Sequence, residues 1–95
     1  MLIQGNKVKK NQLLIPDLVL QDPKAQEILR VWIANNGQHF SLRTDLWNDP
    51  AAWGILLVDL AKNIANAYCK NNGFDKQEVL NRIKEGFDVE WSSPT

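Results

Sequence analysis

The stretch that decides the fold is GQHFSLRTDLWNDPAAWGILLVDLAKNIANAY, residues 37–68. In its first part, polar His39, Ser41 and Arg43 alternate with apolar Phe40 and Leu42. A period of two residues is typical of a half-buried strand, so a strand is predicted near residues 38–43. After a short loop, the apolar spacing changes to that of a helix.

The second part of this stretch predicts a long helix over about residues 50–71. Asp49 can cap the helix, and Pro50 is well tolerated at a first helical position. Gly73 supplies a C-terminal stop. Apolar side chains recur three and four positions apart in between, at Trp53, Leu56, Leu57, Leu60, Ala61, Ile64, Ala65 and Tyr68.

Another Asp–Pro pair, Asp22 and Pro23, predicts a helix over about residues 23–35 by the same reasoning. The sequence NNG at 35–37 would end that helix. Its apolar stripe would consist of Ala25, Ile28, Leu29, Trp32 and Ile33.

A third helix is predicted over about residues 76–91. Asp75 can cap it, and Glu78 stands at the position that completes a capping box. The apolar face continues through Leu80, Ile83, Phe87 and Trp91.

The predicted strand near 38–43 needs a second strand to satisfy its backbone groups. Within the chain, QLLI at residues 12–15, ended by Pro16, is the candidate. The alternative is the same strand from another copy of the protein. Three helices and this small sheet together predict an α+β fold.

Length and composition favour one folded unit. Residues 1–11 are polar and hold Lys7, Lys9 and Lys10, so a flexible N-terminal tail is predicted there. The rest of the 95-residue chain, which is 44% hydrophobic overall, fits a single globular domain over residues 12–95.

Charge and cysteine content exclude several classes of partner. Eleven basic and eleven acidic residues cancel, so nucleic acid is not expected. A run of about eighteen apolar residues is missing, so no membrane partner is expected either. One cysteine, Cys69, fits a reducing, cytoplasmic location, and its thiol has no visible activator in the sequence. The chain contains only one histidine in addition to this cysteine, so neither a metal site nor a cofactor is predicted.

A weak candidate ligand site follows the predicted strand: His39, Ser41, Arg43, Asp45 and Trp47. An imidazole, a hydroxyl and a carboxylate are the groups that nucleophilic catalysis uses. Alternate strand residues lie about 6.6 Å apart, however, and nothing in the spacing brings Asp45 to the imidazole. A solvated or dimer-facing strand surface is therefore favoured, and no catalytic residue is predicted. Trp47 could either close over the core or serve as a binding anchor.

The start of the long helix, AAWGILLV at residues 51–58, is apolar on every side. A glycine inside a helix is often found where another backbone approaches closely, and Gly54 occupies such a place. Ala51, Gly54, Ile55 and Val58 therefore form a candidate interface. The alternative is that LLIPDLVL, residues 13–20, and the strand cover this face within one chain.

The block GQHFSLRTDLWNDPAAWGILLVDLA, with LRVWIANNG before it and FDVEW after it, resembles a family of short bacterial proteins known as domain of unknown function 5076. The resemblance covers roughly residues 12–94. It implies no activity, cofactor or site residue.

These observations favour a small cytoplasmic, non-catalytic module that self-associates, as a homodimer, or binds a protein partner. The hypothesis that the protein is an enzyme is less favoured than that of a non-catalytic module. The alternative is a small-molecule binder or enzyme whose site surrounds His39, Ser41, Arg43 and Asp45.

Overall fold

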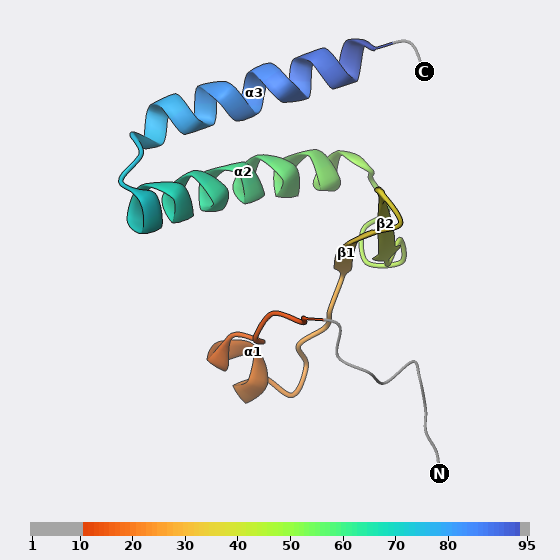
Figure 1. Cartoon of the computed structure of the whole chain (residues 1–95). Coiled ribbons are helices and arrows are strands. Elements are labelled where there is room, and N and C mark those ends of the chain that lie inside the picture. The colour runs from red at the N-terminus through yellow and green to blue at the C-terminus, as the bar shows by residue number, and fades with distance from the viewer. Residues whose placement is uncertain (1–10, 94–95) are drawn as a thin grey trace. The chain divides into compact units, whose positions relative to one another are not determined.

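The computed structural model describes residues 11–93 (Figure 1). In chain order, the elements are α1 (Asp17–Gln21), β1 (Leu29–Ala34), β2 (Gly37–Leu42), α2 (Ala51–Asn72) and α3 (Lys76–Ser92). Three helices and one two-stranded antiparallel sheet confirm the predicted α+β class.

The chain divides into two compact units, residues 1–43 and residues 44–95. Of the predicted flexible tail over residues 1–11, all but Asn11 lies outside the described residues. The expectation of a single globular domain over residues 12–95 stays a prediction.

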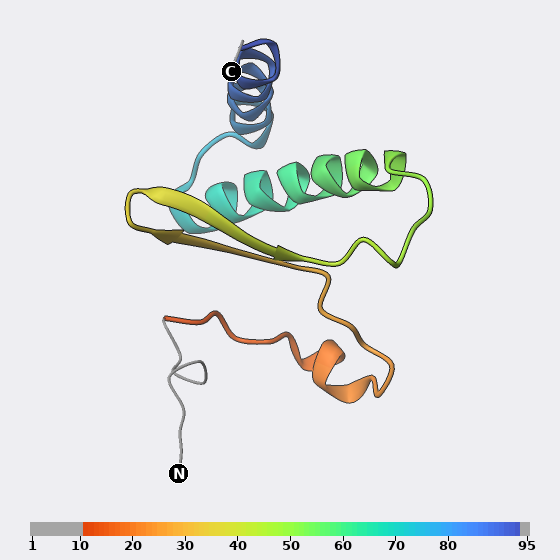
Figure 2. The same cartoon turned by 90° about the vertical axis from the view of Figure 1, so that its right-hand side faces the viewer.

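The first unit contains a β-hairpin made of β1 and β2 (Figure 2). The ladder runs from the pair Leu29 and Leu42 to the pair Ala34 and Gly37. The two turn residues, Asn35 and Asn36, have φ angles of 52° and 61°. A type I′ turn requires positive φ at both central positions, and asparagine tolerates it well. The predicted strand near 38–43 is thus confirmed, and it pairs within the chain.

The helix predicted over residues 23–35 is wrong, because β1 occupies residues 29–34 of that range. Asp22 and Pro23 open a turn instead: the Lys24 N–H donates to Asp22 Oδ1 over 2.8 Å, and the Ala25 N–H donates to the Asp22 carbonyl over 3.1 Å. The run LRVWIA fits a strand equally well, because it is rich in β-branched and aromatic residues. The predicted helix stop at Asn35 and Asn36 is instead the hairpin turn, and Gly37 begins β2.

The strand predicted near residues 12–15 is also wrong, because that segment has no regular structure. The short helix α1 follows it after Pro16, whose carbonyl accepts from the N–H groups of Val19 and Leu20. Within its own unit, α1 contacts neither strand of the hairpin. The hairpin turn brings β1 beside β2, so β2 pairs with residues 29–34 and not with residues 12–15.

The two faces of the hairpin differ in character, because directly opposed residues share a face. One face is apolar and consists of Leu29, Val31, Ile33, Phe40 and Leu42, with Gln38 at its end. The other carries Arg30, Trp32, His39 and Ser41, with Ala34 and Gly37 beside the turn. Most of the apolar face is exposed; Phe40 is 58% accessible and Ile33 is 85% accessible.

The second unit is built on α2, which confirms the helix predicted over residues 50–71. Asp49 Oδ1 accepts from the Ala51 N–H over 3.0 Å at its start. Gly73 closes the helix with φ of 72°, and its N–H donates to the Cys69 carbonyl. This left-handed conformation is the one that favours glycine.

Helix α3 confirms the helix predicted over residues 76–91, and its cap is the predicted one: Asp75 accepts from the Glu78 N–H over 3.0 Å. The helix runs back along α2 in the opposite direction in Figure 1, and Figure 2 shows that the two axes cross. The two helices contact each other, and Ala65 on α2 is completely buried. A small side chain at this position suits a close approach of two helices.

Candidate functional site

The polar face of the hairpin holds part of the predicted ligand site. Ser41 stands opposite Arg30 in the ladder, and His39 stands opposite Trp32, nearer the turn. The His39 Nε2 atom lies 3.0 Å from the Ala34 carbonyl oxygen. Because a carbonyl oxygen can only accept, this contact places a hydrogen on Nε2.

Ser41 and Arg43 line a shallow hollow of about 320 Å³ at the base of the hairpin. Glu27 and Arg30, which sequence reasoning missed, line the same hollow. Arg30 Nε donates to Glu27 Oε2 over 2.6 Å, and Arg43 Nε donates to the Glu27 carbonyl over 3.2 Å. The hollow therefore gathers two guanidinium groups, one carboxylate and one hydroxyl.

The ion pair between Glu27 and Arg30 shapes the electrostatics of this hollow. The hydrogen bond from Arg30 holds the pKa of the Glu27 carboxyl below its ordinary value. Glu27 in turn raises the pKa of the Arg30 guanidinium. Both groups therefore stay charged near neutral pH.

The structure does not bring His39 and Ser41 together as a base and a nucleophile. His39 points its Nε2 at a backbone carbonyl and makes no hydrogen bond with Ser41. Asp45 and Trp47 belong to the second unit, whereas His39, Ser41 and Arg43 belong to the first. Within residues 11–93, no three His, Cys, Asp or Glu side chains gather closely enough to hold a metal ion.

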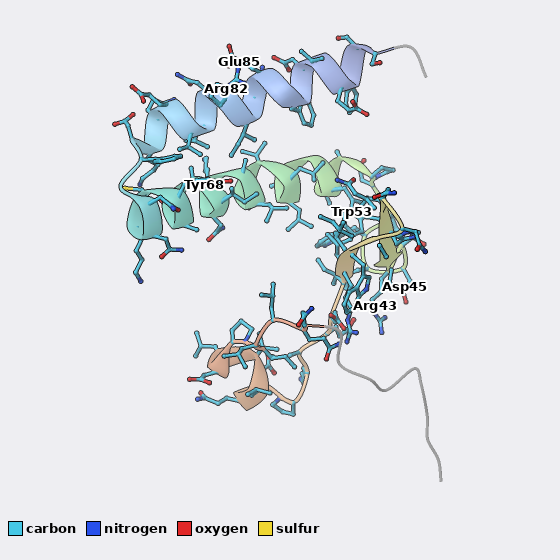
Figure 3. The ribbon with its side chains drawn as sticks, viewed as in Figure 1. Arg43, Asp45, Trp53, Tyr68, Arg82 and Glu85 are labelled. Carbon is cyan, nitrogen blue, oxygen red and sulfur yellow. The ribbon has the colours of Figure 1, made fainter. Side chains whose placement is uncertain are left out.

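Trp47 lies in the loop before α2 and packs against Trp53 on the first turn of that helix. Their ring centroids are 5.6 Å apart and their planes meet at 85°, an edge-to-face arrangement that aromatic pairs favour. Trp47 remains 37% exposed. Figure 3 labels Trp53 at the start of α2.

The candidate interface on α2 is exposed along one side of the helix. Ile55 is 66% accessible and Val58 is 55% accessible. Ala51 is exposed on the same side, one turn before Ile55. Gly54 has open space where a Cβ would stand, so no described residue approaches it closely.

A second surface, which sequence reasoning missed, lies where α2 turns into α3. It is a groove of about 730 Å³. Tyr68 and Phe74 stack in it with centroids 5.6 Å apart. Its charged residues are Asp75, Glu78 and Arg82, and the apolar ones are Ile64, Tyr68, Phe74, Val79 and Ile83. Figure 3 shows the ion pair of Arg82 with Glu85 on the outside of α3. The apolar stripes of α2 and α3 were predicted from the sequence, but the groove depends on how the axes of these two helices cross.

Comparison with solved structures finds a similar chain of known structure. It is described as a "putative pyruvate dehydrogenase" from the photosynthetic bacterium Rhodopseudomonas palustrus CGA009. The two sequences are 36% identical, the match covers 94% of this chain and 91% of that chain, and the TM-score is 0.68. No curated protein matches this chain. Of the helices in the described part of the chain, none has the length and apolar character needed to cross a membrane.

The family comparison agrees with the resemblance seen in the sequence block at residues 37–61. The family model named Domain of unknown function (DUF5076) matches residues 12–95, which is nearly the whole chain. The protein therefore belongs to the DUF5076 family.

Proposed function

We propose that this protein is a non-catalytic interaction module that self-associates as a homodimer. The observation that carries the proposal is the exposure of large apolar side chains on ordered elements, above all Ile55 and Val58 on α2. Fully burying such a side chain is worth about 1.5–3 kcal/mol, so leaving several in water is costly. Contiguous apolar patches of this kind mark interaction surfaces.

Gly54 supports the same surface. It lies one position before Ile55, and nothing stands within 4 Å of the Cβ that an alanine would add. A helix interior without this glycine would be more stable by about 1 kcal/mol. A second copy whose backbone comes close to Gly54 would explain why the glycine is there.

The free thiol of Cys69, exposed on α2, fits a reducing compartment such as the cytoplasm. We place the module there as part of the proposal.

The decisive experiment introduces Ile55→Asp and Val58→Asp together and measures mass by native mass spectrometry and by light scattering after gel filtration. A carboxylate buried without a partner costs a few kcal/mol, so the dissociation constant of the dimer should rise by at least about a hundredfold. Ala67→Asp is the matched control, because Ala67 is exposed on the other side of α2. A wild-type chain that remains single at tens of micromolar would refute the proposal. A double variant that keeps the wild-type dimer would exclude this face of α2 as the interface.

A second candidate function is the binding of a small anion in the hollow of Ser41, Arg43 and Arg30. The hydroxyl and guanidinium groups that line this hollow are donors of the kind that a carboxylate accepts, and the name of the similar chain points to pyruvate, which is a carboxylate. Decarboxylating pyruvate would further require an electron sink such as the thiamine diphosphate ylid. Titration of labelled protein with pyruvate tests this candidate. Shifts of the Ser41 and Arg43 amides that vanish in Arg43→Gln would support it, and their absence at millimolar pyruvate would refute it.

A further inference from the structure

The alternation of the hairpin ladder fixes which backbone groups of β2 point outward. The Arg43 N–H donates to the Ile28 carbonyl over 3.1 Å, so Ile28 and Arg43 form a hydrogen-bonded pair. In an antiparallel ladder such pairs alternate with non-bonded ones. The bonded pairs of β2 are therefore those of Gly37, His39 and Ser41 with β1. Gln38, Phe40 and Leu42 direct their N–H and carbonyl groups away from β1.

These outward groups form an open strand edge. No residue among those described pairs with the backbone of Gln38, Phe40 or Leu42. Proteins usually protect such an edge with a charged side chain, a proline or a bulge. The six residues GQHFSL contain neither charge nor proline, and their register with β1 is unbroken. The outer edge of β1, by contrast, carries Arg30 with its ion-pair partner Glu27 beside it.

The spacing of the outward groups fits a second copy of the same strand. Gln38, Phe40 and Leu42 are symmetric about Phe40, so a two-fold axis at Phe40 satisfies all of them at once. Phe40 then faces Phe40 of the partner subunit, and Gln38 faces the partner's Leu42. Each facing pair exchanges both backbone hydrogen bonds. Moving the axis to any other residue of the strand would leave some of these groups unpaired.

We propose that β2 pairs antiparallel with β2 of a second copy, with the two-fold axis at Phe40, to form a four-stranded sheet. This inference rests on the proposed self-association and adds its register. Edge pairing of this kind draws its affinity from main-chain hydrogen bonds. The apolar faces of the two hairpins join into one continuous apolar face, and no like charges oppose each other across the axis.

The second copy also completes a side-chain pair on the polar face. In this register His39 lies opposite the partner's Ser41, at a non-bonded position where side chains approach most closely. Because His39 Nε2 is directed at the Ala34 carbonyl, the neutral ring offers Nδ1 as an acceptor. The hydroxyl of the partner's Ser41 is the donor placed to reach it.

Cysteine cross-linking in a Cys69→Ser background tests the register. Hydrogen-bonded residues facing each other lie about 5.5 Å apart between Cα atoms, within disulfide reach. Phe40→Cys should therefore form a covalent dimer nearly quantitatively under a glutathione redox buffer. Gln38→Cys is the matched control, because the two copies of residue 38 would stand about 13 Å apart along the strands. An equimolar mixture of His39→Cys and Ser41→Cys should cross-link, whereas each alone should not.

A second pair of variants tests the hydrogen bonds without a cysteine. Gln38→Pro removes an N–H that the hairpin itself does not use, whereas Gln38→Ala keeps it. Losing two bonds per dimer, at about 0.5–1.5 kcal/mol each, weakens the dimer roughly 5-fold to 150-fold. Gln38→Ala should dimerise like the wild type.

The outcomes separate this inference from the proposed function. Cross-linking at residue 40 but not at residue 38, together with a weaker Gln38→Pro dimer, supports the register. A native dimer in which residues 38 and 40 cross-link equally, or in which Gln38→Pro has no effect, overturns the register and leaves self-association standing. A single-chain mass for the wild type overturns both.

Discussion

Ala65 offers the sharpest test of how α2 meets α3. It is the only described hydrophobic residue that is completely buried, and it lies on α2, the helix that contacts α3. Replacing Ala65 with leucine adds three carbon atoms at a site that is closed to solvent. Overpacking of this kind typically costs 1–3 kcal/mol, so the free energy of unfolding should fall by about 2 kcal/mol. For a domain of 60–100 residues, about 2 kcal/mol corresponds to a fall of roughly 8–16 °C in Tm.

The assay is thermal and urea unfolding followed by circular dichroism at fixed protein concentration. Ala67→Leu is the matched control: it makes the same change two positions along the same helix, at an exposed site. Surface changes of this kind stay within about 0.5 kcal/mol. If Ala65→Leu were as stable as Ala67→Leu, then Ala65 would not be enclosed and the contact between α2 and α3 would be wrong.

Three further predictions concern local structure. Gly73→Ala should destabilise the protein by about 1 kcal/mol through its positive φ alone, since a Cβ there meets nothing within 4 Å; Gly86→Ala, in the helix interior and equally open, should instead stabilise it by up to about 1 kcal/mol. Urea unfolding of the two variants decides, and equal effects would contradict the cap geometry. Asp75→Ala should cost about 1 kcal/mol by removing the acceptor for the N–H three residues on, whereas Asp75→Ser should restore most of it; indistinguishable urea midpoints would count against the cap. The Glu27 side chain should titrate below its ordinary pKa by carbon NMR, and Arg30→Gln should raise that pKa. Because the folded pKa is lowered, the pair stabilises the hairpin above the ordinary pKa of glutamate, and this contribution is lost as pH falls through the folded value; an unchanged titration in Arg30→Gln would refute the pairing.

The sequence predicted the second unit closely because several local signals agreed there. A cap at Asp49 or Asp75 and a long stripe at helical spacing favoured the two helices, and Gly73 supplied the stop of the first. They were found at Ala51–Asn72 and Lys76–Ser92. Long periodic segments leave few competing interpretations. The strand near 38–43 was predicted correctly for the same reason, because polar and apolar residues alternate strictly along it.

The first unit was misread where two interpretations fitted one pattern. The run before Asn35 is short, apolar and β-branched, and such a run cannot be told from a helix by spacing alone. The sequence NNG fits a helix stop and a type I′ turn equally well, and the structure shows the turn. With residues 29–34 predicted as helix, residues 12–15 remain as the partner for the strand near 38–43, so one error produces the second.

The candidate site was harder to predict from the sequence than the fold. Glu27 and Arg30 meet Ser41 and Arg43 only because the hairpin brings two distant segments together. The groove beside Tyr68 likewise depends on the crossing of two helices. Neither arrangement leaves a local pattern in the sequence.

The five residues of α1 carry a consequence for experiments in solution. A helix this short cannot persist alone in water, because forming its first turn costs more than one or two hydrogen bonds return. The apolar side chains around it are among the most exposed in the described chain; Leu14, for example, is 96% accessible. The Val19 and Leu20 amides should therefore exchange with solvent almost at once whenever the segment is uncovered. Slow deuterium uptake at these two amides would act as a built-in reporter, telling the experimenter under which conditions something has closed over the segment.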